Sequence, residues 1–174
     1  MKDALIVSAF PGSGKTYMFA NQKNTKYVFN NEIHEFKFKD SDSSKYAKDE
    51  GWEKRYIDDI LKLRVDYDFI FISQHNKVLE ELDRRNIPFA QVIPEARYSD
   101  TKEDVKKEWM KRFYTRDNSH IKDFDKFINL IDTNWDKWTS YENTSYDNST
   151  AFRLRGNQYI GDILRKLYEF KKGI

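Results

Sequence analysis

A chain of 174 residues is long enough for one domain with a hydrophobic core. Its 34% charged and 39% hydrophobic content is typical of a globular protein, and its 16% aromatic content argues against disorder. The absence of cysteine excludes disulfides and thiolate zinc sites, and a formal charge of +2 does not indicate a polyanion partner.

Apolar patterning predicts strands along the whole chain. Continuous apolar runs are typical of strands that are buried on both faces, whereas alternation of apolar and polar residues indicates a half-exposed strand. The predicted strands are residues 3–9, 34–39, 68–73, 87–93 and 150–155. Residues 25–30 are a rival to 34–39 that the pattern does not eliminate. Pro88 stands near the start of its strand, where a missing N–H costs least.

Apolar residues at helical spacing fill the intervals between these strands. Thr101 followed by Asp104 resembles a capping box, which starts one helix there. Polar residues 140–150 have no periodic pattern and are predicted to form a loop. The predicted helices cover about residues 14–21, 50–65, 76–82, 101–113, 121–131 and 160–167.

Strands separated by helices favour parallel pairing through crossover connections. We therefore predict an α/β fold. No internal repeat or linker interrupts the chain, so residues 1–174 are predicted to form a single domain. No apolar run approaches the roughly 20 residues of a membrane helix, and the first strand leaves no room for a signal peptide. We expect a cytoplasmic protein without a membrane partner.

The segment AFPGSGKT, residues 9–16, follows the first strand and opens a helix, the context expected of a Walker A phosphate-binding loop. Glycine can adopt backbone angles that let consecutive N–H groups surround an anion. A lysine in this position neutralises the β- and γ-phosphates, and the following hydroxyl faces Mg²⁺. The predicted ligand is a nucleoside triphosphate with Mg²⁺. The residues predicted to bind it are Pro11, Gly12, Ser13, Gly14, Lys15 and Thr16.

Carboxylates follow the second predicted strand and not the third. Residues 68–73 lead into Ser73-Gln74-His75, without the acidic residue of motor and switch NTPases, which favours a small kinase. Asp40 and Asp42 end the preceding strand and would face the γ-phosphate, because the carboxyl ends of parallel strands share one edge. There a carboxylate can hold Mg²⁺ through water or accept the proton of an attacking hydroxyl. We predict Asp40 as a metal and catalytic residue and Asp42 as a catalytic and acceptor-binding residue.

Cationic residues complete the predicted site. Arg112 and Arg116 are four residues apart on one helix face, where they could disperse charge on the transferring phosphoryl group. Arg55 could hold an acceptor phosphate. The turn with Gly156 and Asn157 follows the last strand and is predicted to contact the nucleotide base.

Four segments together resemble small P-loop kinases of the nucleoside monophosphate kinase group, in particular adenylate-kinase-like proteins of bacteriophages that infect low-GC Gram-positive bacteria. These segments are AFPGSGKT, DSDSS, DFIFISQH and KRFYTRDN. The resemblance implies a three-layer P-loop kinase fold with a five-stranded parallel sheet in the order 2-3-1-4-5 and helices on both faces. It also implies an acceptor-binding region at about residues 40–66, a helical lid at about 95–120, and the host cytoplasm as location.

We therefore expect an ATP-dependent kinase that uses ATP and Mg²⁺ and phosphorylates a small acceptor, first of all a (deoxy)nucleoside monophosphate. A small-molecule kinase of the shikimate or gluconate type is the alternative enzyme, since the Asp-x-Asp pair is also similar to that group. A regulatory protein that binds nucleotides without transferring phosphate is the alternative of a different class. The near-neutral charge disfavours a nucleic-acid kinase.

Overall fold

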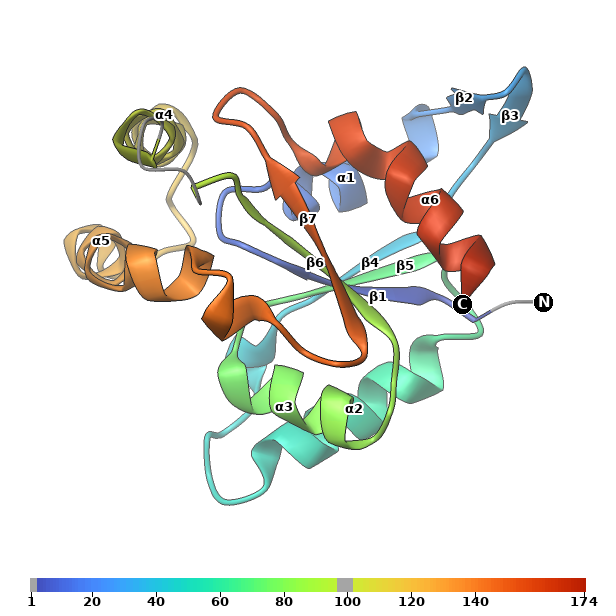
Figure 1. The fold of residues 1–174 in the computed structure, drawn as a ribbon, viewed down its shortest axis with the longest axis horizontal. Coiled ribbons are helices and arrows are strands. Elements are labelled where there is room, and N and C mark those ends of the chain that lie inside the picture. Colours follow the sequence, from blue (N-terminus) through green and yellow to red (C-terminus); the bar gives the residue numbers. More distant parts are fainter. Residues whose placement is uncertain (1–2, 97–101) are drawn as a thin grey trace.

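The computed structural model describes residues 3–96 and 102–174 and contains a five-stranded sheet whose pairings are all parallel (Figure 1). The α/β class and the parallel sheet are confirmed. The strands lie in the spatial order β4 (Phe38–Ser41), β5 (Phe69–Ile72), β1 (Leu5–Ala9), β6 (Phe89–Pro94) and β7 (Ser149–Leu154).

These labels differ from the expected order 2-3-1-4-5 because a separate two-stranded hairpin takes two numbers early in the chain. The hairpin pairs β2 (Tyr27–Phe29) with β3 (Glu32–His34). Its turn residues Asn30 and Asn31 have φ of 52° and 65°, as a two-residue hairpin loop requires. When only the five strands of the large sheet are counted in chain order, their arrangement reads 2-3-1-4-5.

The hairpin also corrects the predicted second strand. We expected the strand at residues 34–39, with 25–30 as its rival, yet both segments contribute to the hairpin and the sheet strand begins only at Phe38. The alternating segment that we predicted as one strand includes the end of β3 and the start of β4. The two strands are joined by residues 35–37, which have no regular structure.

Helices cover both faces of the sheet (Figure 1). The pair α2 and α3 covers one face, α1 and α6 lie on the other, and α4 and α5 stand at the side of the molecule where β1 ends. The helices are α1 (Lys15–Ala20), α2 (Trp52–Leu63), α3 (Asn76–Arg84), α4 (Lys102–Thr115), α5 (Phe124–Thr139) and α6 (Leu164–Gly173). Short 3-10 helices are η1 (Gln22–Asn24), η2 (Ser43–Lys45), η3 (Glu142–Thr144) and η4 (Ile160–Ile163).

Two differences from the predicted helices concern the second half of the chain. The helix expected at 121–131 begins at Phe124 and continues to Thr139, because Trp135 also faces the core and extends the buried stripe. The loop expected at 140–150 contains η3 and the first residues of β7. Part of the expected lid, residues 97–101, lies outside the described residues, and so does Thr101 of the predicted capping box.

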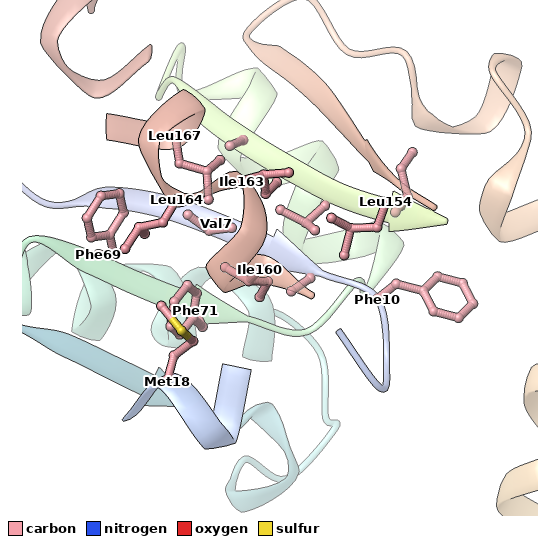
Figure 2. Close-up of a cluster of buried hydrophobic side chains, with 14 of the residues drawn as sticks. Val7, Phe10, Met18, Phe69, Phe71, Leu154, Ile160, Ile163, Leu164 and Leu167 are labelled. Atoms are coloured by element: carbon pink, nitrogen blue, oxygen red, sulfur yellow. The ribbon is translucent and has the colours of Figure 1, made fainter. Parts of the chain in front are cut away.

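Buried side chains on the two faces of the sheet form two cores. Successive residues of β1 point to opposite faces, so Val7 joins one core and Ile6 the other. Figure 2 shows the first core, in which side chains of β1 and β5 pack against Leu164 and Leu167 of α6. Phe10 lies apart from the other labelled side chains, just beyond the end of β1. Within the described residues, no helix has the length and apolarity needed to cross a membrane.

Candidate functional site

The candidate phosphate loop (residues 9–16) joins the end of β1 to the start of α1. Gly12 has φ of 82° and Gly14 has φ of 100°, values that side chains with a Cβ rarely adopt. The backbone therefore uses glycine at the two positions where the sequence predicted that it would be needed. Nearby, Phe10 donates its N–H to the carbonyl of Val92 at 2.9 Å, which ties the entry of the loop to β6.

Lys15 stands at the centre of a group of charged residues. Its Nζ donates to the Ala9 carbonyl at 3.4 Å. Burial lowers the pKa of Lys15. The charges of Asp40 and Asp42 partly oppose this shift, whereas the charge of the nearby Arg116 adds to it. These mutual effects show that the structure brings together four residues that the sequence assigned to the chemistry. They come from four different segments: the candidate phosphate loop, β4, the turn after β4, and the end of α4.

Asp40 and Thr16 are in direct contact. The Thr16 hydroxyl donates to Oδ2 of Asp40 at 2.9 Å, across 24 residues of sequence. Both groups present hard oxygen atoms, the ligands that Mg²⁺ prefers. Within the described ranges no group of three or more potential ligand residues could hold a metal on its own. This arrangement fits Mg²⁺, which keeps water molecules and takes other ligands from a bound triphosphate.

Asp42 caps the short helix η2. Its carboxylate accepts hydrogen bonds from the backbone N–H of Ser44 at 2.9 Å and from the Ser44 hydroxyl at 2.7 Å. Burial alone would raise the pKa of Asp42, but the two bonds from Ser44 and the charges of Lys15 and Lys45 bring this pKa below its ordinary value. Asp42 is therefore a carboxylate at neutral pH, positioned beside the amine that would contact the transferring phosphoryl group.

Arg112 makes contacts that the sequence did not indicate. Its side chain is buried, and its guanidinium donates to the carbonyl oxygens of Gly12 at 3.0 Å, Gly156 at 2.7 Å and Gln158. The guanidinium also lies between two aromatic rings, 3.7 Å from that of Trp109 and 4.0 Å from that of Tyr159. Arg112 thus connects α4 to the candidate phosphate loop and to the turn after β7.

Arg116 differs from Arg112 because α4 ends at Thr115, so the helix face that we predicted for both arginines does not extend to Arg116. It is exposed, its Nε donates to the side chain of Asn118 at 3.0 Å, and its guanidinium lies 4.8 Å from the ring of Phe113. Its electrostatic effect on Lys15 places it near the candidate phosphate loop. Arg112 would have to break its hydrogen bonds to backbone carbonyls to reach a bound phosphate, and Arg116 would not. Of the two predicted lid arginines, Arg116 is therefore the one that could contact a phosphate.

Aromatic residues of α4 and α5 contact the candidate phosphate loop. The indole Nε1 of Trp109 donates to the Pro11 carbonyl at 2.8 Å. Phe10 makes edge contacts with Trp109, Trp135 and Trp138 at centroid distances of 5.8, 5.3 and 6.2 Å. In the sequence, these tryptophans have the spacing of core residues. Their helical spacing could not show that the core they form contains a residue of the loop.

Arg55 is not brought to this group. It is exposed on α2 and pairs with Asp49. The segment before α2 contributes Lys48 instead, which lies 3.9 Å from the ring of Trp52. Burial lowers the pKa of Lys48, whereas the charge of Asp42 opposes that shift. Lys48 is a candidate acceptor-binding residue that sequence reasoning missed, because a lysine in a polar loop carries no distinguishing signal.

Gly156 and Asn157 line a cavity of about 290 Å³ between α4 and the turn after β7. The other lining residues are Glu108, Lys111, Arg112, Thr115 and Tyr159. Tyr159 also covers the candidate phosphate loop, since a Cβ built on Gly14 would lie 3.3 Å from its ring. A larger cavity of about 420 Å³ lies along β7 and is lined by none of the predicted site residues. We therefore assign the smaller cavity to the site.

Comparisons with protein-family models, with curated proteins and with solved structures found no match to this chain. What the geometry brings together is a glycine-containing loop, a lysine, a hydroxyl–carboxylate pair and a second carboxylate, all at the edge where β1 and β4 end.

Proposed function

We propose that the chain is an ATP-dependent phosphotransferase with a P-loop kinase fold, which moves the γ-phosphoryl group of Mg-ATP to a small acceptor. The observation that carries this proposal is the 2.9 Å hydrogen bond between Thr16 and Asp40 beside the amine of Lys15. The hydroxyl and the carboxylate would hold Mg²⁺, and the lysine beside them would neutralise the phosphates of a bound triphosphate.

Each charged group has a role in this proposal. Lys15 neutralises the β- and γ-phosphates, and Thr16 and Asp40 hold Mg²⁺ directly or through water. Bound Mg²⁺ would supply further charge neutralisation at the phosphates. Arg116 approaches the transferring group from α4. Catalysis consists of positioning and charge neutralisation, without a covalent intermediate.

A (deoxy)nucleoside monophosphate is the first acceptor we propose. Its phosphate oxygen attacks the γ-phosphorus, the bond to the β–γ bridging oxygen breaks, and ADP leaves. The anionic acceptor needs cations on the side of Asp42, and Lys48 and Arg116 supply them.

Two observations favour a second candidate, a small hydroxylated acceptor as in kinases of the shikimate or gluconate type. Arg55, which we expected to hold an acceptor phosphate, is engaged by Asp49. Asp42 is a carboxylate near Lys15, where it can orient a hydroxyl and accept its proton during transfer. A hydroxyl must lose its proton during transfer, whereas the phosphate oxygen of a nucleoside monophosphate is already deprotonated at neutral pH. A hydroxylated acceptor therefore needs Asp42 as a proton acceptor, and a phosphate acceptor does not.

A screen of acceptors with γ-labelled ATP tests both candidates. Label on nucleoside diphosphates supports the first, and label on hydroxylated acids or sugars supports the second. Lys15→Ala is the control, since it should abolish transfer while circular dichroism stays that of the wild type. Tight ATP binding without transfer to any acceptor would contradict phosphotransfer and favour a regulatory nucleotide-binding protein.

A further inference from the structure

The cavity beside Gly156 borders the candidate phosphate loop through two shared residues. Arg112 lines the cavity and donates to the Gly12 carbonyl, and Tyr159 lines it and covers Gly14. A nucleotide whose phosphates occupy the candidate phosphate loop can therefore extend its base into this cavity. A volume of about 290 Å³ is sufficient for a purine ring system.

The exposed residue Glu108 lines this cavity, and its charge interacts with that of Arg112. A Cβ built on Gly156 would lie 1.8 Å from Oε2 of Glu108, so the carboxylate rests directly on the glycine backbone. Within the described part of the chain, no hydrogen bond or ion pair engages this carboxylate. Glu108 thus offers two acceptor oxygens to whatever enters the cavity, and any residue larger than glycine at position 156 would displace it.

A second, independent observation indicates that a polar ligand enters here. Arg112 is 7% exposed, and its Nε is buried and has no hydrogen-bond partner, whereas its terminal nitrogens are bonded to three carbonyl oxygens. Buried donors in native proteins are almost always satisfied. Arg112 thus lines the cavity and retains one buried N–H without a partner.

We propose that Glu108 selects the base of the nucleotide donor by accepting a hydrogen bond from an exocyclic amino group. Adenine donates from its 6-amino group, whereas hypoxanthine presents an oxygen there and would be repelled by the carboxylate. This inference rests on the proposed function, because it assumes that a nucleoside triphosphate occupies the candidate phosphate loop. The exposed Lys111 also lines the cavity, and it is present in every variant of the test that follows, so it does not account for a difference between them.

Calorimetric titration with Mg-ATP and Mg-ITP tests the proposal. We expect the wild type to bind ATP at least about ten-fold more tightly than ITP, the size expected for one hydrogen bond to a charged acceptor. In Glu108→Gln the neutral amide can donate to the oxygen of hypoxanthine, so the ratio should fall to about one. Glu103→Gln changes an exposed acid on the same helix that does not line the cavity, and should keep the wild-type ratio.

Equal binding of the two nucleotides to the wild type, or an unchanged ratio in Glu108→Gln, would overturn the proposal. Selective binding that depends on Glu108, together with no transfer to any acceptor, would support it and contradict the phosphotransferase function. Binding of neither nucleotide would overturn both.

Discussion

Replacement of Arg112 by lysine should destabilise the protein, because the arginine holds three backbone carbonyls together. A lysine keeps the charge but has a single ammonium at the end of its chain, which can retain about one of these bonds. Hydrogen bonds to charged groups contribute roughly 1.5–3 kcal/mol each, so the loss of two should lower the free energy of unfolding by about 3–6 kcal/mol. For a chain of this size, the midpoint of thermal unfolding should fall by about 6–24 °C.

The assay is thermal unfolding followed by circular dichroism, with Arg116→Lys as the matched control. Arg116 is exposed and donates only to the side chain of Asn118, so its replacement should leave the unfolding midpoint within about 1 °C. In an acceptor assay the control should instead lose transfer. If Arg112→Lys unfolds at the wild-type temperature, Arg112 does not hold α4 against the candidate phosphate loop.

Four further substitutions test other parts of the site. Burial lowers the pKa of Lys15, so the charged side chain opposes folding, and the stability without ligand should rise with pH between the lowered pKa and the ordinary pKa of lysine. Lys15→Met should therefore raise the unfolding midpoint and remove this pH dependence. The same variant should bind Mg-ATP about 10–100-fold more weakly in calorimetry. Asp40→Asn should raise the Mg²⁺ concentration needed for half-maximal activity by about ten-fold, whereas Asp42→Asn should lower kcat by about 10²–10⁴-fold at saturating Mg²⁺ if the acceptor is a hydroxyl. Phe10→Ala removes a fully buried ring and should cost about 3–5 kcal/mol in denaturant unfolding, with a change in tryptophan fluorescence.

The sequence predicted those parts of the fold that depend on local pattern. The continuous apolar runs around β1 and β5 identified the two central strands, because a parallel strand with helices on both faces has no polar side to interrupt the run. The glycines of the candidate phosphate loop were predicted for a similar reason. Positive φ at Gly12 and Gly14 is a property of the residue type and does not depend on distant contacts.

What the sequence did not show depends on contacts between distant segments. Arg112 and Arg116 have the same residue type and were predicted on the same helix face, yet one is buried among backbone carbonyls and the other is exposed just after the end of α4. The difference arises because the turn after β7 reaches only the first of them. Arg55 was expected to face an acceptor, but its partner Asp49 lies six residues away in a loop whose conformation no periodic pattern describes.

The contacts of α4 limit the way in which the expected lid can work. Trp109 and Arg112 bond this helix to the backbone of the candidate phosphate loop, and Phe10 packs into the tryptophans of α4 and α5. A lid that closed by moving α4 as a whole would have to break these bonds in each turnover. Arg116, at the end of the helix, can change its partner by side-chain rotation alone. In the phosphotransferase that we propose, the movement that brings Arg116 to the γ-phosphate would therefore be a rotation of this side chain, while the contacts of α4 hold the candidate phosphate loop in place.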